Sequence, residues 1–160
     1  MKIKIGVISD THLHKVTGEF KDIYDRYLSD KDGVFHAGDM VSVDIAEFLN
    51  NGSFHGVHGN MDPLDVKMLL PGKKVIETGG FRIGLIHGWG AAEGLEHRIR
   101  SEFKDVDVIV YGHSHKAANF YSDGVLFINP GTATGYSSSG IHTIGILEIS
   151  DTVEFSIIKI

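Results

Sequence analysis

The chain has 160 residues, 42% of them hydrophobic, and a formal net charge of −6. This length suits a single domain over residues 1–160, and the lack of cysteine excludes disulfides, thiolate nucleophiles and zinc-thiolate sites. Dispersed acidic residues disfavour an extended nucleic-acid surface, and no apolar run reaches the roughly 18 residues of a membrane span, so we expect no membrane and a cytoplasmic location.

The first part of the chain alternates predicted strands and helices. Residues 2–8 first alternate between polar and apolar side chains and then become apolar, as in a strand that enters a buried sheet. Residues 18–29 carry apolar side chains at helical spacing. Short strands are predicted at 34–36 and 53–57, and Ser42 is a candidate N-cap for a helix that ends at Leu49. This order of strands and helices predicts parallel strand pairing.

A hairpin and a second strand–helix pattern follow. Residues 73–78 and 81–86 flank Gly79-Gly80, which is a strong signal for a two-residue hairpin turn. Residues 91–103 have an apolar stripe that predicts a helix, and 107–111 are a buried strand.

The last third of the chain is predicted to be nearly all β. Two antiparallel hairpins are expected around Ser122-Asp123-Gly124 and Ser150-Asp151. Their arms are residues 119–121 with 125–128, and 141–149 with 152–159. Residues 131–140 are rich in Gly, Ser and Thr, and we expect a flexible surface loop there.

Six short polar clusters each follow a predicted strand and together supply Asp, His and Asn. The carboxyl ends of parallel strands converge in space, so these side chains are expected to meet. Their oxygen and imidazole donors suit hard and borderline divalent metals. The clusters are Asp10-Thr11-His12, Gly38-Asp39, Gly59-Asn60, His87-Gly88, Gly112-His113-Ser114-His115 and Asn129-Pro130-Gly131.

Two of the clusters contain paired donors two residues apart. On extended backbone, Asp10 and His12 would share one face, as would His113 and His115, and each pair could hold one ion. Asp10 could equally close a turn or cap a helix. Two imidazoles that leave an apolar strand are seldom structural, because each needs a hydrogen-bond partner.

Three single candidates have structural alternatives. Asp39 could bridge two cations or simply form a turn, and Asn60 could be a neutral oxygen ligand or a left-handed turn residue. His87 on its own could be a satisfied structural histidine. No dinucleotide-binding glycine motif, phosphate loop or nucleophile elbow is present to indicate other chemistry.

Five motifs follow one another along the chain in the order Asp10-x-His12, Gly38-Asp39, Gly59-Asn60-x-Asp62, His87-Gly88 and Gly112-His113-x-His115. This order resembles that of the calcineurin-like metallophosphoesterase superfamily, and within it the small phosphodiesterases of the YfcE type. The resemblance implies an α/β, four-layer αββα sandwich of two mixed sheets flanked by helices. It implies one metal at Asp10, His12, Asp39 and His115. A second metal would lie at Asp39 as the bridge, Asn60, His87 and His113.

The resemblance also implies phosphodiester hydrolysis by a metal-bridging hydroxide, in which Asp39, Asn60 and His113 take part in catalysis. Mixed oxygen and nitrogen donors favour Mn²⁺ or Ni²⁺, with Zn²⁺, Fe or Mg²⁺ as alternatives. Many superfamily members place a proton-donating His after the Asn, whereas this chain has Met61. Alternative functions are a phosphomonoesterase and a metal-binding scaffold, and exposed strand edges in the tail would allow a homo-oligomer.

Overall fold

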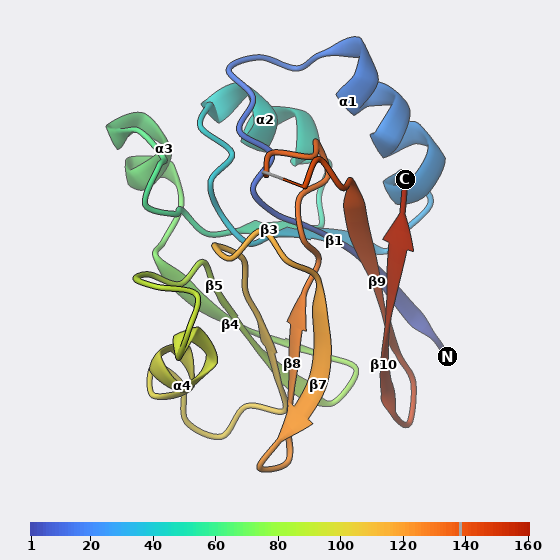
Figure 1. The fold of residues 1–160 in the computed structure, drawn as a ribbon. Coiled ribbons are helices and arrows are strands. Elements are labelled where there is room, and N and C mark those ends of the chain that lie inside the picture. The colour runs from blue at the N-terminus through green and yellow to red at the C-terminus, as the bar shows by residue number, and fades with distance from the viewer. Residues whose placement is uncertain (138) are drawn as a thin grey trace.

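Two five-stranded sheets form the centre of the computed structural model, which describes residues 1–137 and 139–160 (Figure 1). Sheet A has the strand order β10-β9-β1-β2-β3, and sheet B has the order β4-β5-β6-β8-β7. The strands of sheet A are β1 (Ile3–Ile8), β2 (Gly33–His36), β3 (Phe54–Gly56), β9 (Thr143–Ile149) and β10 (Val153–Lys159). Those of sheet B are β4 (Lys73–Thr78), β5 (Phe81–Ile86), β6 (Val108–Val110), β7 (Ala118–Ser122) and β8 (Val125–Asn129).

Each sheet has three parallel strands that run toward the same edge. In sheet A these are β1, β2 and β3, which confirms the predicted parallel pairing. In sheet B they are β5, β6 and β8. Antiparallel strands complete both sheets: β9 and β10 extend sheet A beyond β1, while β4 and β7 flank sheet B.

Alternate residues of the central strands pack on opposite faces of each sheet. Ile5 and Val7 of β1 pack in the core between the sheets, while Ile8 lies in the core under the helices. In β6, Val108 points into the core between the sheets and Ile109 points outward. Both faces of both sheets are therefore buried, which explains the nearly continuous apolar runs of these strands.

Helices cover the outer faces and complete the expected αββα layers. The helices on sheet A are α1 (Gly18–Ile23), the π-helical turn η1 (Tyr24–Leu28), α2 (Val43–Leu49) and α3 (Leu64–Leu69). On sheet B, α4 (Leu95–Arg100) packs through Leu95 and Ile99. Ser42 caps α2 by accepting a hydrogen bond from the Asp44 N–H, as predicted.

The sequence missed one helix and mispredicted the extent of two. The predicted helix 18–29 is α-helical only to Ile23 and continues as η1. The predicted helix 91–103 is limited to α4, because Gly94 directly before it has a left-handed φ of 75°. Helix α3 was missed because its apolar residues do not form one buried face: Val66 is buried, whereas Leu64, Met68 and Leu69 are exposed.

The Gly/Ser/Thr-rich segment 131–140 is not simply a flexible surface loop. Gly131, Thr132 and Ala133 are buried, and Thr132 is hydrogen-bonded to the end of β1. Residue 138 within it lies outside the described residues. The correction has a physical reason: small side chains let this backbone pack against the neighbouring sheet end.

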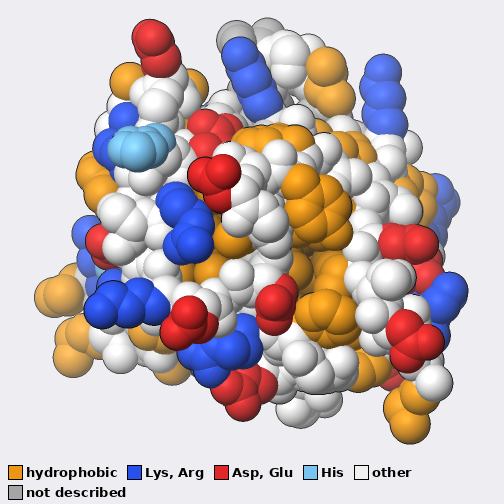
Figure 2. All heavy atoms as spheres, turned by 90° about the horizontal axis from the view of Figure 1, so that it is seen from below, with side chains coloured by type: hydrophobic (Ala, Val, Ile, Leu, Met, Phe, Trp, Pro, Cys, Tyr) orange, Lys and Arg blue, Asp and Glu red, His pale blue; other side chains and the backbone are white. Residues whose placement is uncertain are grey.

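The opposite end of the sandwich, where the hairpin turns lie, has a mainly hydrophobic centre. Figure 2 shows a central hydrophobic area there, with acidic and basic side chains around it. A shallow hollow of about 240 Å³ at this end contains Phe81, Tyr121, Leu126 and Val153. Among the described residues, no helix is long and apolar enough to cross a membrane.

Candidate metal centre

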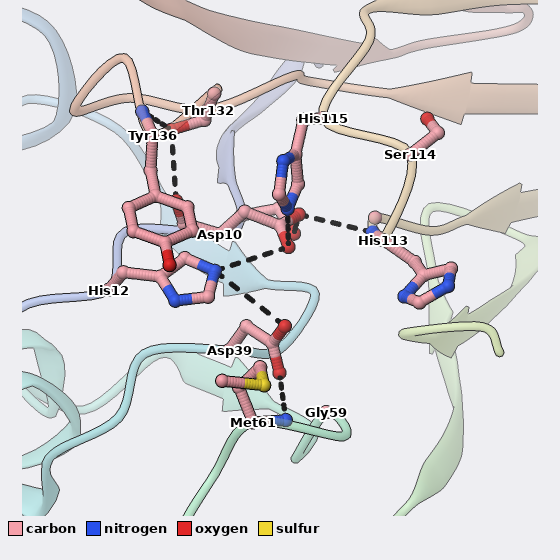
Figure 3. A network of polar contacts seen from close by, with 12 residues as sticks. Asp10, His12, Asp39, Gly59, Met61, His113, Ser114, His115, Thr132 and Tyr136 are labelled. Atoms are coloured by element: carbon pink, nitrogen blue, oxygen red, sulfur yellow. Dashed lines mark hydrogen bonds and ion pairs between the residues drawn. The ribbon is translucent and has the colours of Figure 1, made fainter. Parts of the chain in front are cut away.

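The predicted ligands come together at the edge where the parallel strands of both sheets end. Sheet A places Asp10 and His12 after β1, Asp39 after β2 and Asn60 after β3. Sheet B places His87 directly after β5, and His113 and His115 after β6. Figure 3 shows Asp10, His12, Asp39 and His115 converging from segments that are far apart in the sequence.

Asp10 lies at the centre of the cluster. Its Oδ1 atom is 3.3 Å from His115 Nε2, 3.8 Å from His87 Nε2 and 3.9 Å from His12 Nε2. Two groups of potential metal donors share this residue: Asp10 with His12 and His115, and Asp10 with Asp39 and His87. The chain thus places two adjacent sets of donors around one buried carboxylate.

Asp39 and Asn60 extend the cluster toward the second set of donors. Asp39 Oδ2 is 3.1 Å from His87 Nε2 and 3.7 Å from His12 Nε2, so it lies between imidazoles of the two sets. Asn60 Oδ1 is 3.1 Å from His87 Nε2 and 3.2 Å from His113 Nδ1. All seven predicted ligands are therefore in one cluster.

The local backbone differs from the extended conformation that the sequence suggested. Asp10, His12, Asp39, His113 and His115 all have positive φ, between 47° and 71°. Left-handed backbone in non-glycine residues costs on the order of 1–3 kcal/mol each and concentrates at functional sites. The paired residues converge because the chain turns sharply past each strand end, and not because they alternate along a strand.

Two imidazoles are held by backbone carbonyls that leave their other nitrogen facing the cluster. His87 Nδ1 is 2.8 Å from the Ala37 carbonyl oxygen, and His113 Nε2 is 2.7 Å from that of Gly90. Each carbonyl can accept only from a protonated nitrogen, so in the neutral imidazoles the lone pair lies on Nε2 of His87 and on Nδ1 of His113. This arrangement is typical of metal-ligating histidines.

The donor set fits divalent cations. Asp10 Oδ1 and His12 Nε2 are buried and have no hydrogen-bond partner among the described residues. Buried polar atoms are almost always satisfied, so two such atoms within 3.9 Å of one another call for a ligand. A cation would satisfy both, and mixed carboxylate, amide and imidazole donors are what borderline divalent metals accept.

When no cation is present, the carboxylates and imidazoles of the cluster shift one another's pKa values. Burial alone would raise the pKa of both aspartates. Contacts with His115 and His12 nevertheless hold the pKa of Asp10 below its ordinary value, and contact with His87 does the same for Asp39. Contact with Asp10 raises the pKa of His115. Burial lowers the pKa of His87, yet its contacts with Asp39 and Asp10 outweigh burial and raise it.

Asp62 organises the loops that hold Asp39 and Asn60. Its buried carboxylate accepts hydrogen bonds from the backbone N–H groups of Asp39 (2.9 Å), Val41 (2.7 Å) and Gly59 (2.7 Å). Asp62 directly follows Met61, which occupies the position where the resemblance leads us to expect a proton-donating His. A carboxylate that accepts three N–H bonds is fixed as an acceptor, so the structure assigns it to loop positioning instead.

Two glycines leave room for the carboxylates. A Cβ atom on Gly59 would lie 2.2 Å from Asp39 Oδ1, and one on Gly112 would lie 2.7 Å from Asp10 Oδ2 and 2.1 Å from Ser9 Oγ. Any larger residue at either position would push a carboxylate out of place. The glycines next to the polar clusters thus belong to the site.

The sequence did not reveal the role of Thr132 and Tyr136. The Thr132 hydroxyl donates to the Asp10 carbonyl and accepts from the Tyr136 N–H, both at 2.9 Å (Figure 3). The Tyr136 ring stacks on His12 with a centroid distance of 3.6 Å. Only the glycine next to the Asn129-Pro130 turn hinted that this segment approaches the site.

His36 is a structural histidine beneath the cluster. It is fully buried, its Nδ1 accepts from the Gly38 N–H at 3.1 Å, and its Nε2 lies 3.0 Å from Thr11 Oγ1. Burial lowers its pKa to about 4. It therefore stays neutral and ties the ends of β1 and β2 together.

The comparisons with known proteins agree with this geometry. The model of the calcineurin-like phosphoesterase superfamily domain matches residues 3–152. The chain belongs to this superfamily. A phosphodiesterase of Methanocaldococcus jannaschii is 34% identical over 164 residues, which cover 91% of this chain and 93% of that protein.

Solved structures of the superfamily's fold give the same result. An archaeal phosphodiesterase structure is 32% identical, covers 99% of this chain and 100% of its own, and has a TM-score of 0.75. Vps29 of Entamoeba histolytica, solved in complex with Zn²⁺, is 29% identical, covers 98% and 99%, and has a TM-score of 0.71. The calcineurin-like α/β fold predicted from the motif order is confirmed.

Proposed function

We propose that this chain is a dinuclear metal-dependent phosphodiesterase. The observation that supports it most directly is the pair of donor sets around Asp10, which contain the unpartnered buried atoms Asp10 Oδ1 and His12 Nε2. The superfamily membership and the similarity to archaeal phosphodiesterases point to the same reaction.

The residues divide into two proposed metal sites. Asp10, His12 and His115 would hold one ion, while Asn60, His87 and His113 would hold the other, with Asp39 shared between them. Bound ions would supply a nucleophilic water of lowered pKa and neutralise charge on the phosphoryl oxygens. Mn²⁺ or Ni²⁺ suits these donors best, with Zn²⁺, Fe or Mg²⁺ as alternatives.

Met61 stands where many superfamily members have a proton-donating His, and His58 beside Asn60 is the remaining candidate for a proton donor. Met61 donates its backbone N–H to Asp39 Oδ1 at 2.9 Å, and its side chain is 56% exposed and cannot transfer a proton. We therefore expect rates to fall steeply as the leaving group becomes more basic. A flat dependence across phenol and alcohol esters would show that another residue protonates the leaving group.

Hydrolysis of bis(p-nitrophenyl) phosphate by metal-stripped protein tests the proposal. Turnover should appear on titration with Mn²⁺ or Ni²⁺ and should be lost in His113→Ala, while His97→Ala, a change at an exposed position of α4, serves as the matched control. Faster turnover of p-nitrophenyl phosphate than of the diester would favour a phosphomonoesterase. No turnover of either ester with any ion would contradict the enzymatic proposal.

The similarity to Vps29 supports a second candidate, a metal-binding scaffold without catalysis. This chain keeps all seven predicted ligands in one cluster, which favours the enzyme. Stoichiometric metal binding combined with absent turnover on both esters would favour the scaffold. Self-association through β10 or β7, the edge strands in the last third of the chain, stays a prediction that light scattering can test.

A further inference from the structure

Two cavities open beside the metal centre and share no lining residue. One, of about 320 Å³, contains His12, Val41, Met61 and Tyr136. The other, of about 510 Å³, contains Asn60 and His87 from the opposite part of the cluster. We call the larger one the Trp89 cavity, and its further walls include His58, Lys67, Lys73, Trp89 and Glu102.

Trp89 lies at this cavity on a loop whose backbone is tied to α4, and its side chain is exposed. It is the only tryptophan in the chain and is 44% exposed. Its loop is fixed from α4 by Arg98, which donates to the carbonyls of Trp89 (3.0 Å), Glu93 (3.1 Å) and Ala91. An exposed indole offers a face on which a planar ring can stack, and the anchored backbone means that the loop itself does not have to be ordered on binding.

The charges in the cavity differ in sign from the chain as a whole. Lys73 Nζ is 3.4 Å from Glu102 Oε1, so these two charges largely compensate. Lys67 takes part in none of the ion pairs formed within residues 1–137 and 139–160. One positive charge therefore remains in the cavity of a chain whose net charge is −6, and an ammonium group is a common partner for phosphate.

We propose that the Trp89 cavity binds one substituent of the phosphodiester, and that this substituent is a nucleoside bearing a second phosphate. Its base would stack on Trp89, and its second phosphate would lie near Lys67. The volume of about 510 Å³ is in the range of small-molecule sites. This inference rests on the proposed function, because it orients the diester at the same metal centre.

A series of three chromogenic diesters tests it. Methyl p-nitrophenyl phosphate lacks the nucleoside, thymidine 5′-(p-nitrophenyl phosphate) adds it, and the 3′-phosphorylated form of that ester adds the second phosphate. Each step should raise kcat/KM, on the order of tenfold for the stacked base. Trp89→Ala should reduce the first gain, and Lys67→Ala should reduce the second.

Matched controls lie far from the cavity. Tyr121→Ala removes an exposed aromatic ring from β7, and Lys159→Ala removes a lysine from β10. Both should leave the ratios of kcat/KM among the three esters unchanged. Trp89→Phe should retain part of the nucleoside gain, which separates stacking from a structural role of this position.

Trp89 fluorescence supplies a readout that does not need turnover. With Zn²⁺ present or absent, thymidine 3′,5′-bisphosphate should change the emission in a saturable way, and Lys67→Ala should weaken its binding several-fold. If no ester is hydrolysed while the fluorescence titration saturates, the proposed function fails and the nucleotide site stands. Equal kcat/KM for all three esters, or no fluorescence response, would overturn the nucleotide site.

Discussion

The two sheets contribute different chemistry to the same centre. Sheet A supplies both carboxylates, the amide and one imidazole: Asp10, Asp39, Asn60 and His12. Sheet B supplies imidazoles alone: His87, His113 and His115. Each donor set therefore exists only when the sheets pack together, and the metal centre is a property of the interface between them.

The difference between the sheets is also electrostatic. The pKa of Asp10 and of Asp39 on sheet A is lowered, and the pKa of His87 and of His115 on sheet B is raised, because these groups face one another. Without a cation, protons on the imidazoles of sheet B favour their contacts with the carboxylates of sheet A. A cation must displace those protons, so metal binding and proton binding compete.

Replacing a carboxylate of sheet A should have the largest effect. Asp39→Asn removes the proposed shared ligand, so both ions should be lost, and activity should fall on the order of 1,000-fold. His115→Ala on sheet B should release only one ion. Metal content by mass spectrometry after dialysis checks both. Full occupancy of one site in Asp39→Asn would reject the shared role.

Loosening the support of sheet A's ligands should have an intermediate effect. Asp62→Asn replaces one acceptor oxygen by an NH₂ group among three N–H donors, and we expect about 10- to 100-fold weaker metal binding. Asp65→Asn, an exposed change on nearby α3, is the control. Unchanged metal affinity in Asp62→Asn by calorimetry would contradict the positioning role.

The loop that joins β8 to β9 should matter less than the ligands. Thr132→Val leaves the Asp10 carbonyl and the Tyr136 N–H without their partner, at a cost of about 1–3 kcal/mol of unfolding free energy. Denaturant unfolding measures this cost. Thr152→Val, exposed between β9 and β10, should change stability by less than about 0.5 kcal/mol. Equal effects of the two changes would show that the loop does not support β1.

The smallest expected effect is on the pH dependence of stability. Because the raised pKa values of His87 and His115 keep protons on the folded, metal-free protein, its unfolding free energy should fall as pH rises above 6.5. With Zn²⁺ bound, the slope should reverse, since deprotonated imidazoles bind the ion. Thermal unfolding between pH 6 and 8 measures both slopes. The same slope in His87→Gln/His115→Gln would contradict this origin.

Local patterns were sufficient for most strands and for the hairpin pairs, but not for the sheet that each hairpin joins. The Gly79-Gly80 turn and the buried runs of β1, β5 and β6 were predicted because period-two burial and turn chemistry are local properties. The sequence could not show that the two hairpins of the tail split, with β7 and β8 in sheet B and β9 and β10 in sheet A. The sheet that a hairpin joins depends on which apolar faces meet, and the packing of the whole chain decides which faces those are.

The site shows the same division. The residue types and their positions after strands predicted that these side chains converge, because strand ends of a parallel sheet meet. The family resemblance then supplied the full ligand set: Asp10, His12, Asp39, Asn60, His87, His113 and His115. Only the tertiary structure revealed the left-handed turns that aim these side chains, and the anchoring of the 131–136 segment on β1. Backbone turns and long-range hydrogen bonds leave no periodic trace in a sequence, so only the packed sheets determine them.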